Sequence, residues 1–312
     1  MTRALALTVL CTALLGCQAS TAATSSQVVP TQKALFDSSK AWEHLRQMVA
    51  LGPRPSGSPA IRQTRAYITR QLAAVGLVAE EQRFTAQTPK GPIDMVNLIV
   101  RLPGKRTDRI LFTGHYDTKL FTDVVFLGAS DGASSGAFLI ELARVLKDQS
   151  REFTYEFVWF DGEEAVVDWY HKLPDGTTDN TYGSKYYVQA AKKANALAGI
   201  KAMILVDMIG DRDLNIKREI QSTSWLTDVI WAAAKRIGHA NVFQTESHEI
   251  SDDHLPFLAA GVPAVDLIDF DYPAWHTPAD NLSAVSARSL QIVGDVMLAA
   301  IPDIEKRLSS MK

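Results

Sequence analysis

The sequence predicts an α/β fold with a central, twisted, mostly parallel (mixed) β-sheet that is flanked by helices on both faces. From residue 94 onward, short runs of bulky, β-branched and aromatic residues alternate with longer segments of helical periodicity. Such alternation is typical of parallel strands covered on both faces by helices. The chain has 312 residues, of which 46% are hydrophobic and 21% charged, so it holds enough apolar side chains for one large domain.

Two amphipathic helices are expected before the alternation begins. Ser38 or Ser39 can cap a helix that continues through Leu51, and a second helix is expected over residues 60–75. The segment GPRPSGSP, residues 52–59, separates them because its prolines and glycines interrupt helical geometry.

Strands and helices then follow in turn. The expected strands are residues 94–102, 109–114, 155–160, 202–207 and 264–268. The expected helices lie near residues 132–147, 183–196, 223–237, 253–260 and 284–308. Ligands of open α/β sheets bind beyond the carboxyl ends of the strands, so we expect the functional residues at those ends.

The N-terminus predicts export from the cytoplasm. Arg3 precedes an apolar run that is too short to span a membrane, which indicates a signal segment over residues 1–17. Cys17 directly follows Leu-Leu-Gly, which resembles the lipobox of bacterial lipoproteins. We therefore expect a periplasmic or extracytoplasmic protein whose only membrane attachment is a lipid on Cys17; cleavage of a plain signal within residues 19–24 is the alternative.

The remaining chain is expected to consist of a tether and one domain. Residues 18–34 are small and polar, as in a flexible tether, and residues 35–312 form a single α/β domain. Cys11 lies in the removed segment, so the mature chain keeps at most one cysteine and has neither an internal disulfide nor a multi-cysteine metal site. A net charge of -3 and a pI near 6.2 provide no basic surface for nucleic acid.

The stretch FVWFDGEEA, residues 157–165, is the strongest indication of a functional site. Its apolar strand stops at Asp161-Gly162, and two adjacent carboxylates, Glu163 and Glu164, follow at once. Neighbouring side chains point in different directions, so one carboxylate can bind a ligand while the other moves protons.

Other strand and helix ends carry similar residues. They are His115, Asp131, Asp207, the Asp252-Asp253 pair and His276. Carboxylates crowded into one crevice repel each other and need a cation, and the imidazoles favour zinc over calcium or magnesium. Taken singly, Asp131 and the Asp252 pair could be helix caps, His115 a core histidine and Asp207 a turn former, but five such ends together favour a metal site.

Seven motifs resemble a known family. They are GHYDTK (114–119), GASDGASSG (128–136), FDGEEA (160–165), YGS (182–184), VDMIG (206–210), SDDHLPFLAAGVP (251–263) and WHTPADN (275–281). In order and spacing they are similar to the M28-type zinc exopeptidase fold, which is shared by aminopeptidases and glutaminyl-peptide cyclotransferases. The resemblance covers nearly all of the chain after residue 35 and implies a zinc-exopeptidase-like domain.

The closer likeness is to animal-type glutaminyl cyclases. It depends on Trp169 shortly after Glu164, Trp275 directly before His276, the double acid before His254, and Gly132, where many two-zinc aminopeptidases carry another residue. The chain departs from the secreted animal enzymes in lacking their cysteine pair, and Asp271 and Tyr272 do not match their pocket.

The likeness implies a role for each site residue. One zinc ion would be bound by Asp131, Glu164 and His276. Glu163 would be the general acid/base, joined by Asp207 and Asp252 in a hydrogen-bonded acid network. Trp169 and Trp275 would line a pocket for the N-termini of peptides or proteins, and we expect the enzyme to be a monomer.

Two other functions remain open at this point. In a two-zinc aminopeptidase, His115 and Asp207 would hold a second ion, Asp131 would bridge the two, and Glu163 would deprotonate a metal-bound water. All of these ligands are present, so residue identity does not separate hydrolysis from cyclisation. A catalytically inactive, lipid-tethered binding protein is the third interpretation.

Overall fold

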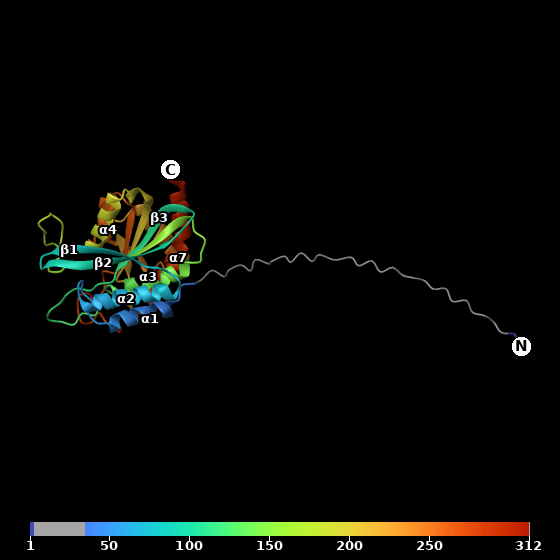
Figure 1. Cartoon of the computed structure of the whole chain (residues 1–312), viewed down its shortest axis with the longest axis horizontal. Helices are drawn as coiled ribbons and strands as arrows, with labels where there is room; N and C mark the ends of the chain where they lie inside the picture. The colour runs from blue at the N-terminus through green and yellow to red at the C-terminus, as the bar shows by residue number, and fades with distance from the viewer. Residues whose placement is uncertain (3–34, 312) are drawn as a thin grey trace. The chain divides into compact units, whose positions relative to one another are not determined.

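A six-stranded mixed sheet lies at the centre of the molecule (Figure 1). The computed structural model describes residues 1–2 and 35–311, and those from 35 onward form one compact unit. The remainder of the expected signal segment, Cys17 and the expected tether lie outside the described residues. Within the described ranges, no helix combines the length and the apolar character needed to cross a bilayer.

The strand order is β1-β2-β4-β3-β5-β8. The strands are β1 (Glu80–Thr88), β2 (Gly91–Leu102), β3 (Arg106–His115), β4 (Phe153–Phe160), β5 (Ile200–Asp207) and β8 (Ala264–Ile268). Strands β4, β3, β5 and β8 are parallel, whereas β2 is antiparallel to both β1 and β4. In this register His115 pairs with Phe160, and Asp207 pairs with Ile268, so the four parallel strands end at one edge, as predicted.

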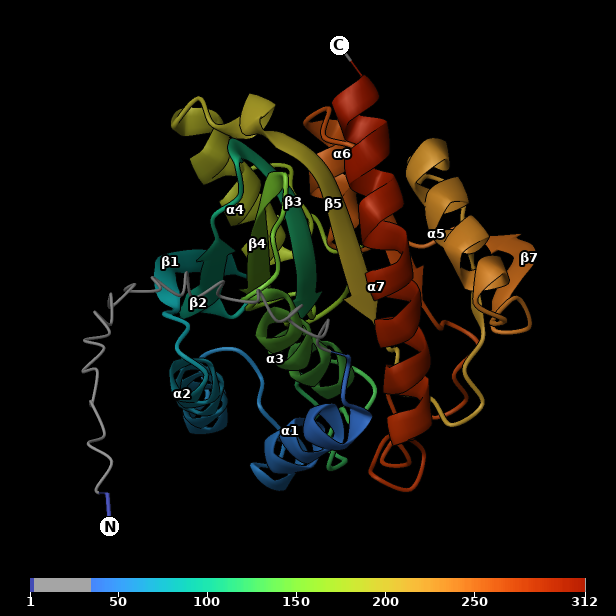
Figure 2. The same ribbon diagram turned by 90° about the vertical axis from the view of Figure 1, so that its right-hand side faces the viewer.

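Helices cover both faces of the sheet, which confirms the predicted fold class (Figure 2). One face packs against α1 (Ser38–Ala50), α2 (Pro59–Ala74), α3 (Ala133–Leu146), α5 (Ser224–Arg236) and α7 (Ala287–Ser310). The other face packs against α4 (Tyr182–Lys193) and α6 (His254–Ala259). Along β4, Phe157 and Trp159 belong to the first core and Val158 and Phe160 to the second, so the strand is apolar on both sides.

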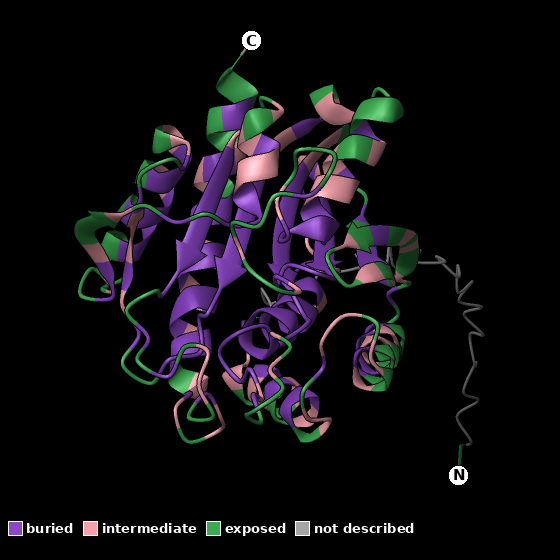
Figure 3. Cartoon of the chain, turned by 90° about the vertical axis from the view of Figure 1, so that its left-hand side faces the viewer, coloured by how far each residue is buried: buried purple, intermediate pink, exposed green. Residues whose placement is uncertain are grey.

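Exposure follows this layered arrangement. The central strands are buried, and the exposed residues gather on the outer surfaces of the helices and on the loops (Figure 3). A small parallel sheet of β6 (Ile216–Glu219) and β7 (Phe243–His248) lies beside α5, and a short 3-10 helix, η1 (Leu197–Gly199), precedes β5.

The first helix is capped differently from the prediction. Asp37, rather than Ser38 or Ser39, is the N-cap, because its carboxylate accepts the backbone N–H of Ser39 at 3.0 Å. The second helix begins after Ser58, whose hydroxyl accepts the N–H of Ile61.

Three strands were not predicted from the sequence. β1 has the polar sequence EEQRFTAQT and is mostly exposed, because it is an edge strand that pairs only with β2. β6 and β7 are short and pair with each other outside the main sheet. Their sequences lack the buried apolar pattern by which strands are recognised.

Replacement of Gly294 by alanine should destabilise the domain. Gly294 lies in α7 where the ring of Phe36 packs against the backbone, and a methyl group there would overlap that ring. Overpacking costs about 1–3 kcal/mol, against about 1 kcal/mol gained from the better helix former. We expect a net loss in the free energy of unfolding, measured by urea denaturation. Gly199→Ala, where the new methyl meets nothing within 4 Å, should change it by less than about 0.5 kcal/mol; equal effects at both positions would contradict the packing assigned to Phe36.

Candidate functional site

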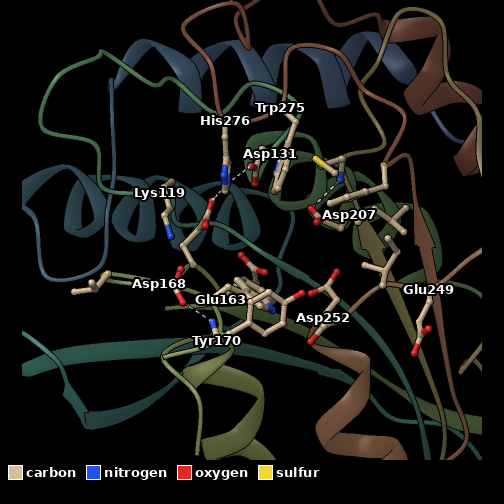
Figure 4. Close-up of a pocket in the computed structure, with 18 residues that line it drawn as sticks. Lys119, Asp131, Glu163, Asp168, Tyr170, Asp207, Glu249, Asp252, Trp275 and His276 are labelled. Carbon is tan, nitrogen blue, oxygen red and sulfur yellow. Dashed lines mark hydrogen bonds and ion pairs between the residues drawn. The ribbon is translucent and has the colours of Figure 1, made fainter. Parts of the chain in front are cut away.

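A cavity of about 370 Å³ opens at the carboxyl edge of the four parallel strands (Figure 4). Its walls come from loops that follow β4, β5, β7 and β8, and from the turn that precedes α3. The lining includes seven predicted site residues besides Trp169: Asp131, Glu163, Glu164, Asp207, Asp252, Trp275 and His276. The structure therefore gathers residues that are up to 145 positions apart in the sequence.

The three predicted metal ligands meet in one cluster. His276 Nε2 lies 3.2 Å from Glu164 Oε1 and 3.4 Å from Asp131 Oδ2, and one ligand atom from each residue lies within 4.8 Å of the others. Asp131 Oδ2 is buried and has no hydrogen-bond partner. A buried, unpartnered carboxylate oxygen beside an imidazole fits a cation, so this donor set suits zinc.

A second cluster shares Asp131. His115 Nε2 lies 3.2 Å from Asp131 Oδ1 and 3.0 Å from Asp207 Oδ1, and these three residues also form a group that could hold an ion. The two oxygens of Asp131 thus face different clusters, which is the arrangement that a bridging carboxylate requires.

The turn before α3 leaves the Asp131 carboxylate free for this role. Gly132 at the N-cap has φ +88° and no side chain, so Asp131 does not cap the helix. The Asp280 carboxylate accepts the backbone N–H groups of Ser130 at 2.7 Å and Asp131 at 3.1 Å, and also the hydroxyl of Tyr272. Asp280 therefore fixes the turn from which Asp131 projects.

A buried guanidinium lies behind the same turn. Arg54 is fully buried and donates hydrogen bonds to the carbonyls of Tyr116 (2.9 Å), Leu127 (2.6 Å) and Gly128 (2.8 Å). Burial lowers the pKa of Arg54 to about 10, which still leaves it charged at neutral pH. Its positive charge partly offsets that of the nearby acids.

The two glutamates project from a turn that is held by Asp117. Gly162, with φ +75°, allows the chain to turn directly after β4. The backbone N–H groups of Glu163 and Glu164 each donate to the Asp117 carboxylate at 3.3 Å, and Asp117 Oδ1 lies 3.4 Å from His115 Nδ1. Sequence reasoning assigned no role to Asp117, although its place two residues after His115 at a strand end was a usable signal.

His276 lies between two acids that favour its protonated form. Burial lowers the pKa of His276, but the neighbouring carboxylates of Asp131 and Glu164 outweigh this effect and raise the pKa to about 10. A metal ion that binds here must displace that proton, so its affinity should fall as the pH falls.

Glu163 is buried and resists ionisation. Burial raises the pKa of Glu163 well above its ordinary value, and the charges of Glu164 and Asp252 act in the same direction. The carboxyl group can therefore hold a proton near neutral pH, which suits a general acid/base.

The expected hydrogen-bonded acid network takes a different form. Within residues 35–311, no hydrogen bond joins Glu163 to Asp207 or Asp252; Asp207 Oδ1 instead accepts the backbone N–H of Met208 at 2.7 Å. The charges of Asp207 and Asp252 nevertheless raise the pKa of Glu163. Carboxylates that lie near one another disfavour each other's charged form, which is how Asp207 and Asp252 act on Glu163 without a hydrogen bond to it.

His254 and Asp253 contact other side chains of the domain. His254 is fully buried, with Nε2 3.2 Å from Glu219 and Nδ1 3.7 Å from Asp266. Asp253 accepts the hydroxyl of Ser184 and does not cap α6 with its side chain.

Both tryptophans line the cavity. The Trp275 ring is 41% exposed and stacks on His276, with ring centroids 4.2 Å apart, and Trp169 is half-buried. Phe121 and Phe126 contact the His276 ring edge-on, each at 5.6 Å, and were not predicted as site residues. These aromatic contacts fix the orientation of His276, whose backbone has φ +54°.

Comparison with known proteins agrees with this geometry. A model of peptidase family M28 matches residues 97–301. The glutaminyl-peptide cyclotransferase-like protein of Mus musculus is 30% identical over 279 residues, covering 79% of this chain and 71% of the relative. The crystal structure of an Acidobacteriales bacterium glutaminyl cyclase is 39% identical with a TM-score of 0.82, covering 89% of this chain and 98% of that chain.

A more distant structure shares the fold alone. It is a Zn-dependent exopeptidase from Parabacteroides distasonis, which is 22% identical with a TM-score of 0.78 and covers 86% of this chain and 99% of that chain.

Removal of the His276 imidazole should abolish metal binding in the first cluster. Loss of an outer partner of a metal ligand alone weakens binding by about 10- to 100-fold, so we expect His276→Ala to lower zinc affinity by more than about 100-fold. Zinc content after dialysis, measured by mass spectrometry, tests this. His171→Ala, which removes an exposed loop histidine, should keep the wild-type zinc content. Unchanged zinc in His276→Ala would remove this histidine from the ligand set.

Proposed function

The chain belongs to peptidase family M28, and from this premise we propose that it is a zinc-dependent glutaminyl-peptide cyclotransferase. It converts the N-terminal glutamine of peptides to pyroglutamate and releases ammonia. The observation that carries this proposal is the similarity, at 30–39% identity over most of the chain, to proteins named glutaminyl-peptide cyclotransferase and glutaminyl cyclase.

We place one zinc ion between Asp131, Glu164 and His276. The support is their mutual distance and the unpartnered Asp131 oxygen. When bound, this ion would polarise the γ-carboxamide of the substrate as a Lewis acid. The nearby indole of Trp275 and the ring of Trp169 form apolar walls that can hold the glutamine side chain in a curled conformation.

Glu163 would move the protons of the reaction. The substrate's α-amine nitrogen attacks the γ-carboxamide carbon, a new C–N bond closes the lactam ring, and the bond to the amide nitrogen breaks. Glu163 takes a proton from the attacking amine and delivers it to the departing nitrogen, which leaves as ammonia. The raised pKa of Glu163 favours the delivery step, since the carboxyl group retains its proton near neutral pH.

Hydrolysis by a two-metal aminopeptidase is the second candidate. The cluster of His115, Asp131 and Asp207 favours it, because these ligand atoms could hold another ion. Two zinc ions per chain and release of N-terminal residues would support this alternative, whereas one zinc ion and pyroglutamate formation support the cyclase.

Incubation of the purified protein with a peptide that begins with glutamine should yield a product lighter by one ammonia. Glu163→Gln should lower kcat by about 10²- to 10⁴-fold while zinc stays bound, because the carboxylate moves protons rather than binding metal. Mass spectrometry of product and of metal content provides both readouts. Glu246→Gln, on exposed β7 outside the cavity, should match the wild type. Zinc loss in Glu163→Gln would show that the roles of Glu163 and Glu164 are reversed.

We also propose that the enzyme acts outside the cytoplasm, tethered by a lipid on Cys17. The support is the Leu-Leu-Gly-Cys sequence behind an apolar run. In bacteria that express the full chain and are fed a clickable fatty acid, the protein should carry the label. Cys17→Ser should lose it, and Cys11→Ser, in the removed segment, should keep it. A soluble, unlabelled wild-type protein cut within residues 19–24 would refute the anchor.

A further inference from the structure

The loop over residues 166–181 forms one wall of the cavity mouth and is firmly held. Buried Asp179 accepts the backbone N–H groups of Val166 at 3.2 Å, Val167 at 2.7 Å and Asp168 at 3.1 Å. One carboxylate thus fixes three consecutive residues at the start of the loop.

A second set of bonds fixes the next residues. Asn180 Nδ2 donates to the carbonyl of Trp169 at 2.6 Å, and Lys185 Nζ donates to the carbonyls of Asn180 at 2.8 Å and Thr178 at 2.9 Å. The backbone N–H of Tyr170 donates to Asp168 Oδ1 at 3.0 Å. The backbone that carries Trp169 and Tyr170 is therefore ordered, although the loop lies at the surface.

Tyr170 presents an unusually exposed ring at this mouth. It lines the cavity and is 75% exposed, and its hydroxyl has no hydrogen-bond partner within residues 35–311. In Figure 4 the ring lies on the side of Glu163 and Asp252, while Trp275 and His276 lie on the opposite side. An ordered aromatic ring that leaves most of its area in water is suited to cover an apolar ligand.

The opposite wall is aromatic as well. Phe270 and Trp275 are 38% and 41% exposed, and their ring centroids are 4.8 Å apart. Glu163 and the candidate metal cluster line the cavity, so in the proposed reaction the glutamine of a substrate would lie against them. Tyr170 and the Phe270–Trp275 pair line the same cavity and are partly exposed, so they could contact the residue that follows the glutamine.

We propose that Tyr170 selects the second residue of the peptide substrate and favours an aromatic side chain there. The inference rests on the proposed function, because it places the glutamine at the metal end of the cavity. An aromatic second residue would cover the Tyr170 ring and gain ring–ring contact, whereas alanine leaves that ring in water. Contacts of this kind favour the aromatic peptide by about three- to tenfold.

The test compares two peptides that differ only in the second residue, Gln-Phe and Gln-Ala followed by the same sequence. For the wild type we expect kcat/KM to be about three- to tenfold higher for the Gln-Phe peptide. Tyr170→Ala should bring this ratio close to one, chiefly through a higher KM for Gln-Phe, and Tyr170→Phe should retain the ratio because it keeps the ring.

Two further variants define the effect. Ile220→Ala, which removes a 58% exposed apolar side chain outside the cavity lining, should keep the wild-type ratio. Trp275→Ala should raise KM for both peptides, because it removes the wall that is shared by every glutamine substrate.

The outcomes separate this inference from the proposed function. Pyroglutamate formed by the wild type with the same peptide ratio in Tyr170→Ala overturns the inference and leaves the cyclase intact. If the wild type forms no pyroglutamate, the proposed function fails, and the dissociation constants of the two peptides, from tryptophan fluorescence, decide the inference. A Gln-Phe preference that disappears in Tyr170→Ala supports it, and equal dissociation constants for the two peptides overturn it.

Discussion

The site depends on charge compensation among buried acids. Asp131, Glu163, Glu164, Asp207 and Asp252 all line one cavity, and each is at most 6% exposed. Buried carboxylates that line one cavity repel one another in a medium of low dielectric constant, so they coexist only with protons or cations among them. The imidazoles of His115 and His276 and the buried guanidinium of Arg54 can supply part of that charge, and the donor geometry would allow a metal ion to supply the rest.

Two glycines allow the turns that bring these acids together. Gly132 and Gly162 both have positive φ, and a Cβ atom at either position would overlap its surroundings: the Asp117 carbonyl in the first case and Met95 in the second. Asp117 and Asp280 then accept the backbone N–H groups that adjoin the ligands. Asp117 and Asp280 therefore hold the turns that present the candidate metal ligands Glu164 and Asp131.

The sequence predicts the main features of the site because strand ends are visible in it. Glu163 follows an apolar run that stops at an Asp-Gly pair, and parallel strands place such ends on one edge whatever the details of the loops. The supporting residues are harder to find. Arg54 lies in a segment that resembles a simple helix breaker, and Asp179 lies in one that resembles a polar loop. Each residue acts by bonding to backbone groups that are distant in the sequence, such as the Tyr116 carbonyl for Arg54 and the Val167 N–H for Asp179. The edge strand β1 escaped prediction for a related reason, since its exposed residues carry no apolar pattern.

The two clusters that could hold a metal ion are not equivalent. In the cluster with His115, Asp207 Oδ1 already accepts the Met208 N–H and faces His115 Nε2. Burial lowers the pKa of His115, but the charges of Asp207 and Glu163 outweigh burial and raise this pKa well above its ordinary value. A protonated His115 would supply the positive charge that a second ion otherwise provides. On the other side, Asp131 Oδ2 accepts no hydrogen bond and lies 3.4 Å from His276 Nε2 at the cavity wall. The shared carboxylate thus directs its unpartnered oxygen toward the side where the aromatic walls can hold a substrate, which is the arrangement that intramolecular cyclisation needs.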